Sequence, residues 1–188
     1  GLPDTEVKES RDRVRAAIIQ SGFDFPAKKI TVNLAPADLP KESGRFDLPI
    51  ALGILAASGQ IAPEKLAQYE FAGELALSGM LRPVRGALAM AWQGMQAGRS
   101  FVLPQENAKQ AAVMRGITVY GARSLGEVAA HLNGIEPLAQ TACQVPQRSS
   151  ENAKLPDLID VKGQHTARLA LEIAAAGGHS LLMMGSPG

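Results

Sequence analysis

The last eight residues, LLMMGSPG, carry the most specific candidate for chemistry in this sequence. An apolar run passes into Gly185, Ser186, Pro187 and Gly188, as a buried strand does when it enters a glycine-rich phosphate-binding loop. In the motif G-x-x-x-x-G-K-[ST], backbone N–H groups surround the phosphates, the lysine neutralises their charge and the hydroxyl holds Mg²⁺. The sequence holds only the first four of these positions. It predicts either the entry to an ATP site or a proline-glycine surface turn, and little ATP binding by these residues alone, because the lysine is missing.

The histidines and the cysteine form no catalytic or metal-binding constellation. His131, His165 and His179 are scattered, without a carboxylate or cysteine at ligand spacing, so we expect surface or capping roles for them. Cys143 is the single cysteine, which excludes an internal disulfide and favours a reducing, cytoplasmic setting. We therefore expect no metal site and no catalytic residue in this stretch of chain.

Charged residues offer two further candidate sites. Asp47, Glu70 and Glu74 could be arranged as an acid pair, but we expect them to be charges on a solvated face. Eight basic residues could form a surface that meets phosphates: Lys8, Arg11, Arg13, Arg15, Lys28, Lys29, Lys41 and Arg45. Aromatic residues are not interleaved with them, so direct DNA binding by this stretch remains the less favoured of two alternatives.

The composition limits the class of protein. Nineteen basic and eighteen acidic residues leave a net charge of +1, so no global field draws the chain to nucleic acid or membrane. Aromatic residues make up only 4% of the chain, which predicts a core of Ala, Leu, Ile, Val and Met. No apolar stretch is long enough to cross a bilayer, so we expect no membrane partner.

Hydrophobic spacing predicts the elements of the first third of the chain. Residues 4–22 predict a helix that buries Val14, Ala17 and Ile18 and ends at Gly22. Alternating apolar residues over 30–34 predict a half-buried strand, and the prolines and glycine of residues 35–45 predict a loop. The apolar stretch 46–59 predicts a buried helix with proline in its first turn and a glycine stop.

The middle of the chain predicts a hairpin followed by alternating strands and helices. Ser78-Gly79 stands between two apolar runs, which is a hairpin signal. A helix over 86–97, a strand over 101–104, a helix from Gln105, a strand over 117–121 and a helix capped by Ser124 and Glu127 follow. This order predicts an α/β (α+β) domain with a mixed sheet, ending near residue 134.

A second unit follows a polar, proline-punctuated stretch. We assign residues 1–134 to the first domain, 135–156 to a linker and 157–188 to the start of the second domain. In that second domain, a helix is predicted to start at DVKGQ, residues 160–164, with Asp160 as a candidate cap and Gly177-Gly178 as its stop. Its apolar stripe is formed by Ala167, Leu169, Ala170, Ile173 and Ala174. Ser180–Met184 predicts the buried strand that leads to the glycine turn.

Four long stretches, in this order, resemble the magnesium-chelatase-like AAA+ ATPase family. They are GLPDTEVKESRDRVRAAI, FPAKKITVNLAPADLPKESGRFDLPIALGILAASGQI, FAGELALSGMLRPVRGALAMA and DVKGQHTARLALEIAAAGGHSLLMMGSPG. The first three are similar to the amino-terminal domain of that family, and the fourth is similar to the opening of its ATPase module. The resemblance implies a fragment: a first domain without its first strands, and a P-loop AAA+ domain cut inside the Walker A loop.

The resemblance also implies a site and partners. The segment before the first helix of related modules lies beside the adenine, so Val161, Gly163 and Gln164 are expected to line that pocket. The intact protein would use ATP and Mg²⁺, assemble into a ring, expected to be a hexamer, and act on DNA as a motor. The implied process is branch migration and recombination during natural transformation. A magnesium-chelatase-type ATPase subunit is the alternative.

The amino-terminal domain of this family in turn resembles the proteolytic domain of Lon proteases, which makes a serine peptidase a third hypothesis. Lon chemistry needs a serine nucleophile and a lysine that takes its proton. Aligned without gaps, the stretch PKESGRFDLP places Arg45 at the serine position, and Ser43 falls two residues early. The lysine position falls on Leu88, which cannot accept a proton. The resemblance therefore implies a Lon-like domain that is proteolytically inactive.

Overall fold

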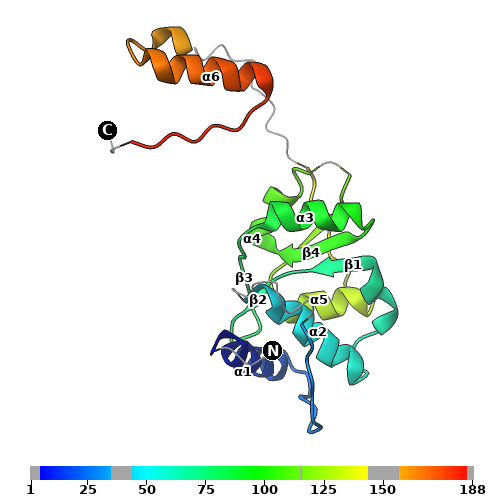
Figure 1. Ribbon diagram of the computed structural model, residues 1–188. Helices are drawn as coiled ribbons and strands as arrows, with labels where there is room; N and C mark the ends of the chain where they lie inside the picture. Colours follow the sequence, from blue (N-terminus) through cyan, green and yellow to red (C-terminus); the bar gives the residue numbers. More distant parts are fainter. Residues whose placement is uncertain (1–4, 35–43, 115, 144–156, 186–188) are drawn as a thin grey trace. The chain divides into compact units, whose positions relative to one another are not determined.

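The computed structural model of this chain describes residues 5–34, 44–114, 116–143 and 157–185. They fall into two units, Gly1–Val145 and Pro146–Gly188. Figure 1 shows the first unit as a small sheet with helices on both of its faces. The predicted α/β class is confirmed, whereas the predicted mixed sheet is wrong, because the described strands form a three-stranded parallel sheet and a separate antiparallel pair.

The central sheet of the first unit contains three parallel strands. They are β1 (Tyr69–Phe71), β4 (Ser100–Pro104) and β5 (Val119–Ala122), in the order β1-β4-β5. β4 pairs with both neighbours, with Val102 opposite Phe71 on one side and Tyr120 on the other. A central parallel strand is covered on both faces, which is why Phe101, Val102 and Leu103 are all apolar and all buried.

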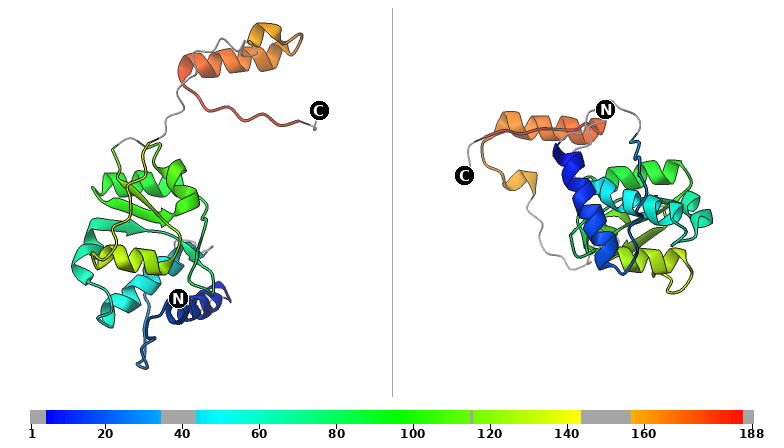
Figure 2. Two further views of the ribbon diagram at one scale, coloured as in Figure 1. Left: turned by 180° about the vertical axis from the view of Figure 1, so that it is seen from behind. Right: turned by 90° about the horizontal axis from the view of Figure 1, so that it is seen from below.

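Helices cover the two faces of this sheet with separate cores. Phe101 and Leu103 point to the face covered by α3 (Ala87–Gln96) and α4 (Gln105–Ala111). Val102 belongs to the core formed with α1 (Thr5–Gln20), α2 (Asp47–Ala57) and α5 (Leu125–Leu132). The alternation along β4 follows from the period of two residues in a strand. The views in Figure 2 also show helices on the two faces of the sheet.

The two amino-terminal helices agree with their prediction. α1 buries Val14, Ala17 and Ile18 and stops before Gly22, which has a φ of 83°. α2 follows the short 3₁₀ helix η1 (Gly44–Phe46), tolerates Pro49 in its first turn and ends before Gly59, where φ is 75°. A second 3₁₀ helix, η2 (Pro63–Gln68), leads into β1.

The predicted hairpin and the capped helix α5 are also confirmed. β2 (Glu74–Leu75) and β3 (Leu81–Arg82) pair antiparallel as a separate two-stranded sheet, and Gly79 in the turn has a φ of 85°. At α5, Ser124 Oγ accepts from the backbone N–H of Glu127 over 3.2 Å. The Glu127 carboxylate accepts from the N–H of Arg123 over 2.8 Å, one residue earlier than in a standard capping box.

The strand predicted over residues 30–34 is wrong. The structure assigns these residues no regular structure, and Ile30 and Val32 are 38% and 49% exposed. A strand needs the backbone of a neighbour, and none of the described strands pairs with this segment. Most of the loop predicted over 35–45 lies outside the described residues.

The segment after α5 lies against the first unit, although the sequence assigns it to a linker. Thr141 N donates to Val119 O over 2.8 Å, and Gln140 forms an antiparallel bridge with Tyr120. The side chain of Leu138 packs on the core. These contacts extend the edge of the sheet beyond β5.

The second unit contains the 3₁₀ helix η3 (Leu158–Asp160) and helix α6 (His165–Gly177). α6 stops where predicted, because Gly178 takes a left-handed φ of 63°. None of the residues described from 157 to 185 is buried. Across the described parts of both units, no helix combines the length and apolar character that a membrane crossing requires.

Candidate functional site

The turn between η3 and α6 carries the three residues expected beside the adenine. η3 is closed by a reciprocal cap, in which Ile159 N donates to Asp157 Oδ1 and Asp157 N donates to Asp160 Oδ2, each over 3.0 Å. Gly163 and Gln164 then take left-handed φ values of 75° and 50°. The expectation that Asp160 caps α6 is wrong, because this left-handed pair turns the chain and makes Gln164 the N-cap residue.

Gln164 holds an unusual backbone conformation at the start of α6. Among the described residues it is the non-glycine residue with a positive φ, a conformation that costs of order 1–3 kcal/mol and concentrates at ligand sites. Gln164 O accepts from Arg168 N over 3.0 Å, and Arg168 Nη1 donates to Val161 O over 3.4 Å. The turn is therefore fastened to the first turn of α6. No side chain caps the helix N-terminus, whose N–H groups are free to receive an acceptor.

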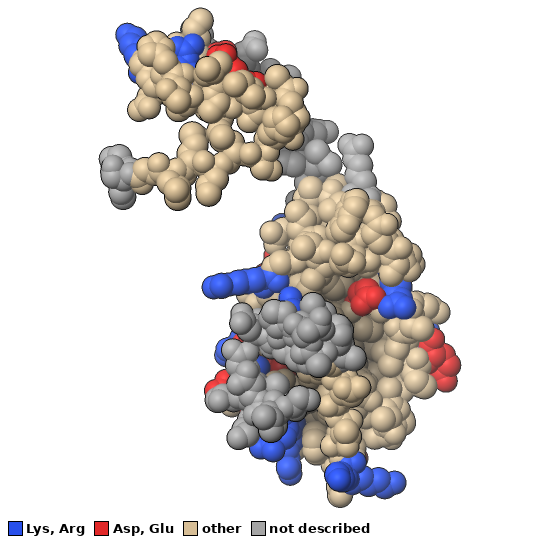
Figure 3. All heavy atoms as spheres, viewed as in Figure 1, with Lys and Arg blue, Asp and Glu red and all other residues tan. Residues whose placement is uncertain are grey.

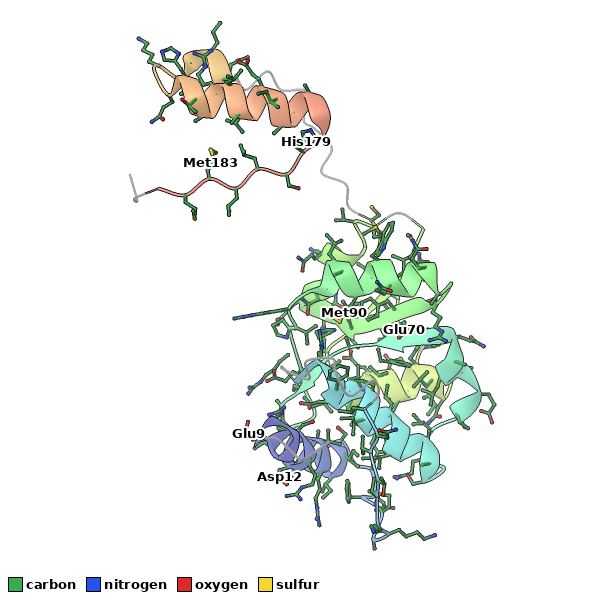
Figure 4. The ribbon with its side chains drawn as sticks, in the orientation of Figure 1. Glu9, Asp12, Glu70, Met90, His179 and Met183 are labelled. Atoms are coloured by element: carbon green, nitrogen blue, oxygen red, sulfur yellow. The ribbon has the colours of Figure 1, made fainter. Side chains whose placement is uncertain are left out.

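The buried strand predicted over Ser180–Met184 is wrong in this chain. The segment has no regular structure, and Leu182 and Met184 are 83% and 90% exposed. A strand is stabilised by pairing, and the described residues of the second unit hold no other strand. The segment instead runs back beside α6 and carries Met183 along it (Figure 4).

The glycine turn itself is only partly visible. Gly185 is described and exposed, whereas Ser186, Pro187 and Gly188 lie outside the described residues. Nothing lies within 4 Å of the position where Gly185 would carry a Cβ. The assignment of these four residues to a phosphate loop, and of Val161, Gly163 and Gln164 to the adenine side, therefore stays a prediction.

The two positions of the Lon-type dyad carry side chains without proton chemistry. The Arg45 guanidinium lies over the Phe46 ring, 4.9 Å from its centroid, and Arg45 O accepts from Gly73 N over 3.0 Å. Leu88 stands in the first turn of α3 and is 41% exposed. Ser43 lies outside the described residues.

The environment of Asp47 differs most from the one predicted. Its carboxylate is fully buried, whereas the sequence predicts a solvated charge. It accepts from Ser10 Oγ over 2.5 Å, from Arg13 Nε over 2.8 Å and from Leu75 N over 3.2 Å. The hydrogen bond to Asp47 raises the pKa of Arg13, with the nearby negative charges of Asp47, Glu74 and Glu9 adding to it. Asp47 therefore ties α1, α2 and β2 together, and its oxygens are occupied.

The remaining acidic candidates are paired at the surface. Glu70 accepts from Arg99 Nη1 over 2.6 Å, and the nearest oxygen of Glu74 lies 3.7 Å from Arg82 Nη1. These carboxylates form exposed or half-exposed ion pairs on separate strands, which is the solvated role expected for them. The described residues contain no group of three or more His, Cys, Asp and Glu residues that could hold a metal ion.

The expected basic surface is reduced by local pairing. Arg13 is bound to Asp47, Arg11 lies 3.1 Å from Asp12, and Arg15 lies over a phenylalanine ring. Figure 3 shows the basic side chains of the visible face in several separate groups, some of them directly beside acidic side chains. Lys28 and Lys29 are exposed, on the segment that follows α1. These two lysines and Arg15 take part in none of the ion pairs found among the described residues.

His131 has an environment that the sequence did not predict. The sequence predicts a surface or capping role, but the ring is half-buried between two tyrosine rings. Nearby, residues 136–141 form one wall of a cleft of about 420 Å³, whose other wall includes Gln105, Gly121 and Arg123. The aromatic residues of β1 and β5 are visible in the sequence. They do not reveal this environment, because the sequence does not show how these strands pair.

Comparisons with known proteins match both units. A family model described as subunit ChlI of Mg-chelatase matches residues 1–107, and one described as magnesium chelatase, subunit ChlI, matches residues 157–188. The uncharacterized protein YifB of Escherichia coli is 50% identical over 188 residues, and competence protein ComM of Haemophilus influenzae is 48% identical over 191 residues. An uncharacterized protein of Mycobacterium tuberculosis is 40% identical over 192 residues. Each match covers the whole chain, which spans 37% of the relative's length.

Proposed function

The chain belongs to the magnesium-chelatase subunit ChlI family, as a protein of the ComM and YifB type, and from this membership we propose that the intact protein is an ATP-driven DNA motor. In this proposal an AAA+ ATPase ring, expected to be a hexamer, moves branched DNA and promotes recombination during natural transformation. The observation that carries the proposal is the 48% identity to competence protein ComM across the whole chain. At this identity both units, and not only a shared ATPase module, follow the relative.

The second unit supports ATP use by its own geometry. The glycine at position 185 leaves backbone open to an anionic ligand, and the uncapped N-terminus of α6 with the left-handed turn at Gln164 leaves polar backbone groups that can meet the adenine. We assign Gly185, Ser186, Pro187 and Gly188 to the phosphates. Val161, Gly163 and Gln164 are assigned to the adenine. ATP would supply the driving reaction and Mg²⁺ its charge neutralisation, through residues that follow this stretch.

We propose that the first unit is a Lon-like domain that has lost its peptidase chemistry. Its parallel sheet, its separate hairpin and the helix α3 after the hairpin support the likeness. The stacking of Arg45 on Phe46 and the aliphatic side chain of Leu88 support the loss, because neither side chain can serve as nucleophile or base. Its present role would be to dock substrate or to assemble the ring.

A magnesium-chelatase-type ATPase subunit is the second candidate. The descriptions of the two matching family models favour it, since both name a chelatase subunit. Such a protein would drive metal insertion into a porphyrin together with partner subunits. It shares the ATPase module with the first proposal and differs in its substrate.

The test uses the full-length protein that extends beyond Gly188. ATP hydrolysis is measured with and without branched DNA, and strand exchange is followed on a labelled four-way junction. We expect branched DNA to stimulate ATP hydrolysis and the junction to be separated into duplexes only when ATP is present. The 188-residue chain serves as the control, and we expect it to hydrolyse no ATP.

Other outcomes would support a different function. ATP hydrolysis that DNA does not change, together with porphyrin metallation in the presence of chelatase partner subunits, would establish the second candidate. Cleavage of casein by the 188-residue chain would overturn the inactive-peptidase assignment. A sequence after Gly188 without Gly-Lys-Ser or Gly-Lys-Thr within the next four residues would remove the ATP site itself.

A further inference from the structure

His131 joins three parts of the first unit through its two ring nitrogens. It stands near the end of α5, and its Nε2 lies 3.1 Å from the hydroxyl oxygen of Tyr69 on β1. Its Nδ1 accepts from the backbone N–H of Leu138 over 3.0 Å. Leu138 lies in the segment from Ile135 to Thr141, which we call the edge segment. One imidazole thus connects a helix, a strand and the edge segment.

These bonds fix the protonation state of the ring. A backbone N–H can only donate, so Nδ1 of His131 must carry a lone pair and the ring proton must be on Nε2. Nε2–H then donates to the Tyr69 oxygen. The bond to Leu138 exists only while the imidazole is neutral.

The surroundings also favour the neutral ring. The ring centroids of Tyr69 and Tyr120 lie 5.4 Å and 5.2 Å from that of His131. Burial lowers the pKa of His131, and the positive charge of Lys65 on η2 lowers it further. Two carboxylates lie near it in sequence: Glu127, one turn earlier on α5 and bonded to Arg123 N, and Glu136 in the edge segment.

The edge segment is held at both ends and in the middle. At its start, Ile135 N and Glu136 N donate to Ala130 O over 2.9 Å and 3.3 Å. At its end, Thr141 N donates to Val119 O over 2.8 Å. In the middle of the segment, the backbone N–H of Leu138 donates to His131. Because residues 136–141 are also one wall of the 420 Å³ cleft, the position of the middle sets the width of that cleft.

We propose that His131 is a proton-operated latch that holds the middle of the edge segment against α5 and keeps the cleft beside Gly121 narrow. Protonation of Nδ1 converts an acceptor into a donor that faces the donating N–H of Leu138. The bond is lost and two N–H groups are opposed, so the middle of the edge segment moves away from α5. The bonds at Ala130 and Val119 do not involve the imidazole, so the segment stays tethered at its ends.

The test compares the 188-residue chain with two variants by NMR and amide hydrogen exchange between pH 7.5 and 4.5. His131→Asn places a non-titrating oxygen where Nδ1 stands, so it can still accept from Leu138. Tyr69→Phe removes only the partner of Nε2, which donates in both protonation states. The amide of Asn133, bonded to Ala129 O on α5, is the internal reference.

We expect the protection factor of the Leu138 amide, corrected for intrinsic exchange, to fall at least tenfold as the His131 ring protonates, while that of Asn133 stays constant. The fall should persist in Tyr69→Phe and disappear in His131→Asn. Titration of the ring without a change at Leu138 would overturn the proposal. An equal fall in wild type and His131→Asn, or a ring that stays neutral down to pH 4.5, would also overturn it.

Discussion

Arg13 on α1 and Asp47 at the start of α2 form an ion pair of 2.8 Å in which the carboxylate is fully buried. The same carboxylate accepts from the backbone of Leu75 in the hairpin. A single side chain therefore fixes how two helices and a strand meet. Charge burial of this kind is tolerated only when the hydrogen bonds around it are complete.

Replacing Asp47 should destabilise the first unit strongly. Asp47→Ala leaves Arg13 without its main partner and the N–H of Leu75 unbonded, so we expect a loss of about 3–5 kcal/mol in the free energy of unfolding. Urea denaturation followed by circular dichroism measures it. The control is Glu70→Ala at the exposed pair with Arg99, where we expect a loss of at most about 1 kcal/mol. Similar losses in the two variants would contradict the buried role of Asp47.

Asn107 should be a second buried anchor. Its Oδ1 accepts from Val84 N over 2.8 Å and its Nδ2 donates to Val84 O over 3.1 Å, so it replaces a strand partner for the chain after the hairpin. Asn107→Ala should cost about 1–3 kcal/mol, since the buried backbone groups of Val84 lose their partner. Lys109→Ala, on the exposed side of the same helix, should stay within about 0.5 kcal/mol. Thermal unfolding of both variants measures these losses. Equal losses in the two variants would show that Asn107 is no buried anchor.

Two glycines should respond to alanine in opposite directions. A Cβ at Gly73 would lie 2.7 Å from Leu81 Cδ2 and 3.4 Å from Leu48 Cβ, so Gly73→Ala should cost about 1–3 kcal/mol. Gly53 is an exposed helical residue of α2 with nothing within 4 Å of its Cβ position. Gly53→Ala should stabilise the protein by about 0.5–1 kcal/mol, because alanine restricts the unfolded chain. Denaturant midpoints that move the same way for both would refute the close approach at Gly73.

Stability should depend on pH through His131. Its pKa in the folded protein is lowered by burial and by Lys65, so the folded state binds the proton less readily than the unfolded state. The stabilisation is complete above the unfolded pKa of about 6.5 and is lost as pH falls from there through the folded pKa. The difference in unfolding free energy between wild type and His131→Asn should therefore shift against wild type below pH 6.5. A constant difference from pH 8 to 5 would exclude this contribution.

The exposed lysines after α1 test whether this stretch contacts DNA. Lys28→Ala with Lys29→Ala removes two charges that pair with no carboxylate among the described ion pairs. If the surface binds phosphates, the affinity for labelled branched DNA should fall and its salt dependence should lose a slope of about two. Lys109→Ala is the matched control on α4. Flat titration curves for wild type at low and moderate salt would exclude DNA binding by this basic surface.

Local sequence signals predicted those elements that depend on neighbouring residues. The stops at Gly22, Gly59 and Gly178 and the turn at Gly79 are set by the left-handed conformation that glycine adopts freely. The cap at Ser124 is likewise a contact over three residues. The alternation of strands and helices predicted the α/β class, but not that the hairpin would form a sheet of its own beside a three-stranded parallel sheet.

Contacts between distant residues could not be predicted in this way. The burial of Asp47 depends on Arg13, 34 positions earlier, and the environment of His131 on Tyr69, 62 positions earlier. The segments 30–34 and 180–184 have strand-like sequences, but pairing with another backbone decides whether a strand forms. The same limit leaves the proposed ATP residues open, since a phosphate loop is defined by the residues that surround it.

The absence of buried side chains among residues 157–185 has a calorimetric consequence. Heat capacity and enthalpy of melting scale with the apolar surface that unfolding exposes, and this unit has little left to expose. A melting curve of the 188-residue chain therefore reports the first unit almost exclusively. Substitutions at Gln164 or Arg168 should leave its midpoint unchanged, and their effects must be read from the helicity of α6 or from ligand affinity.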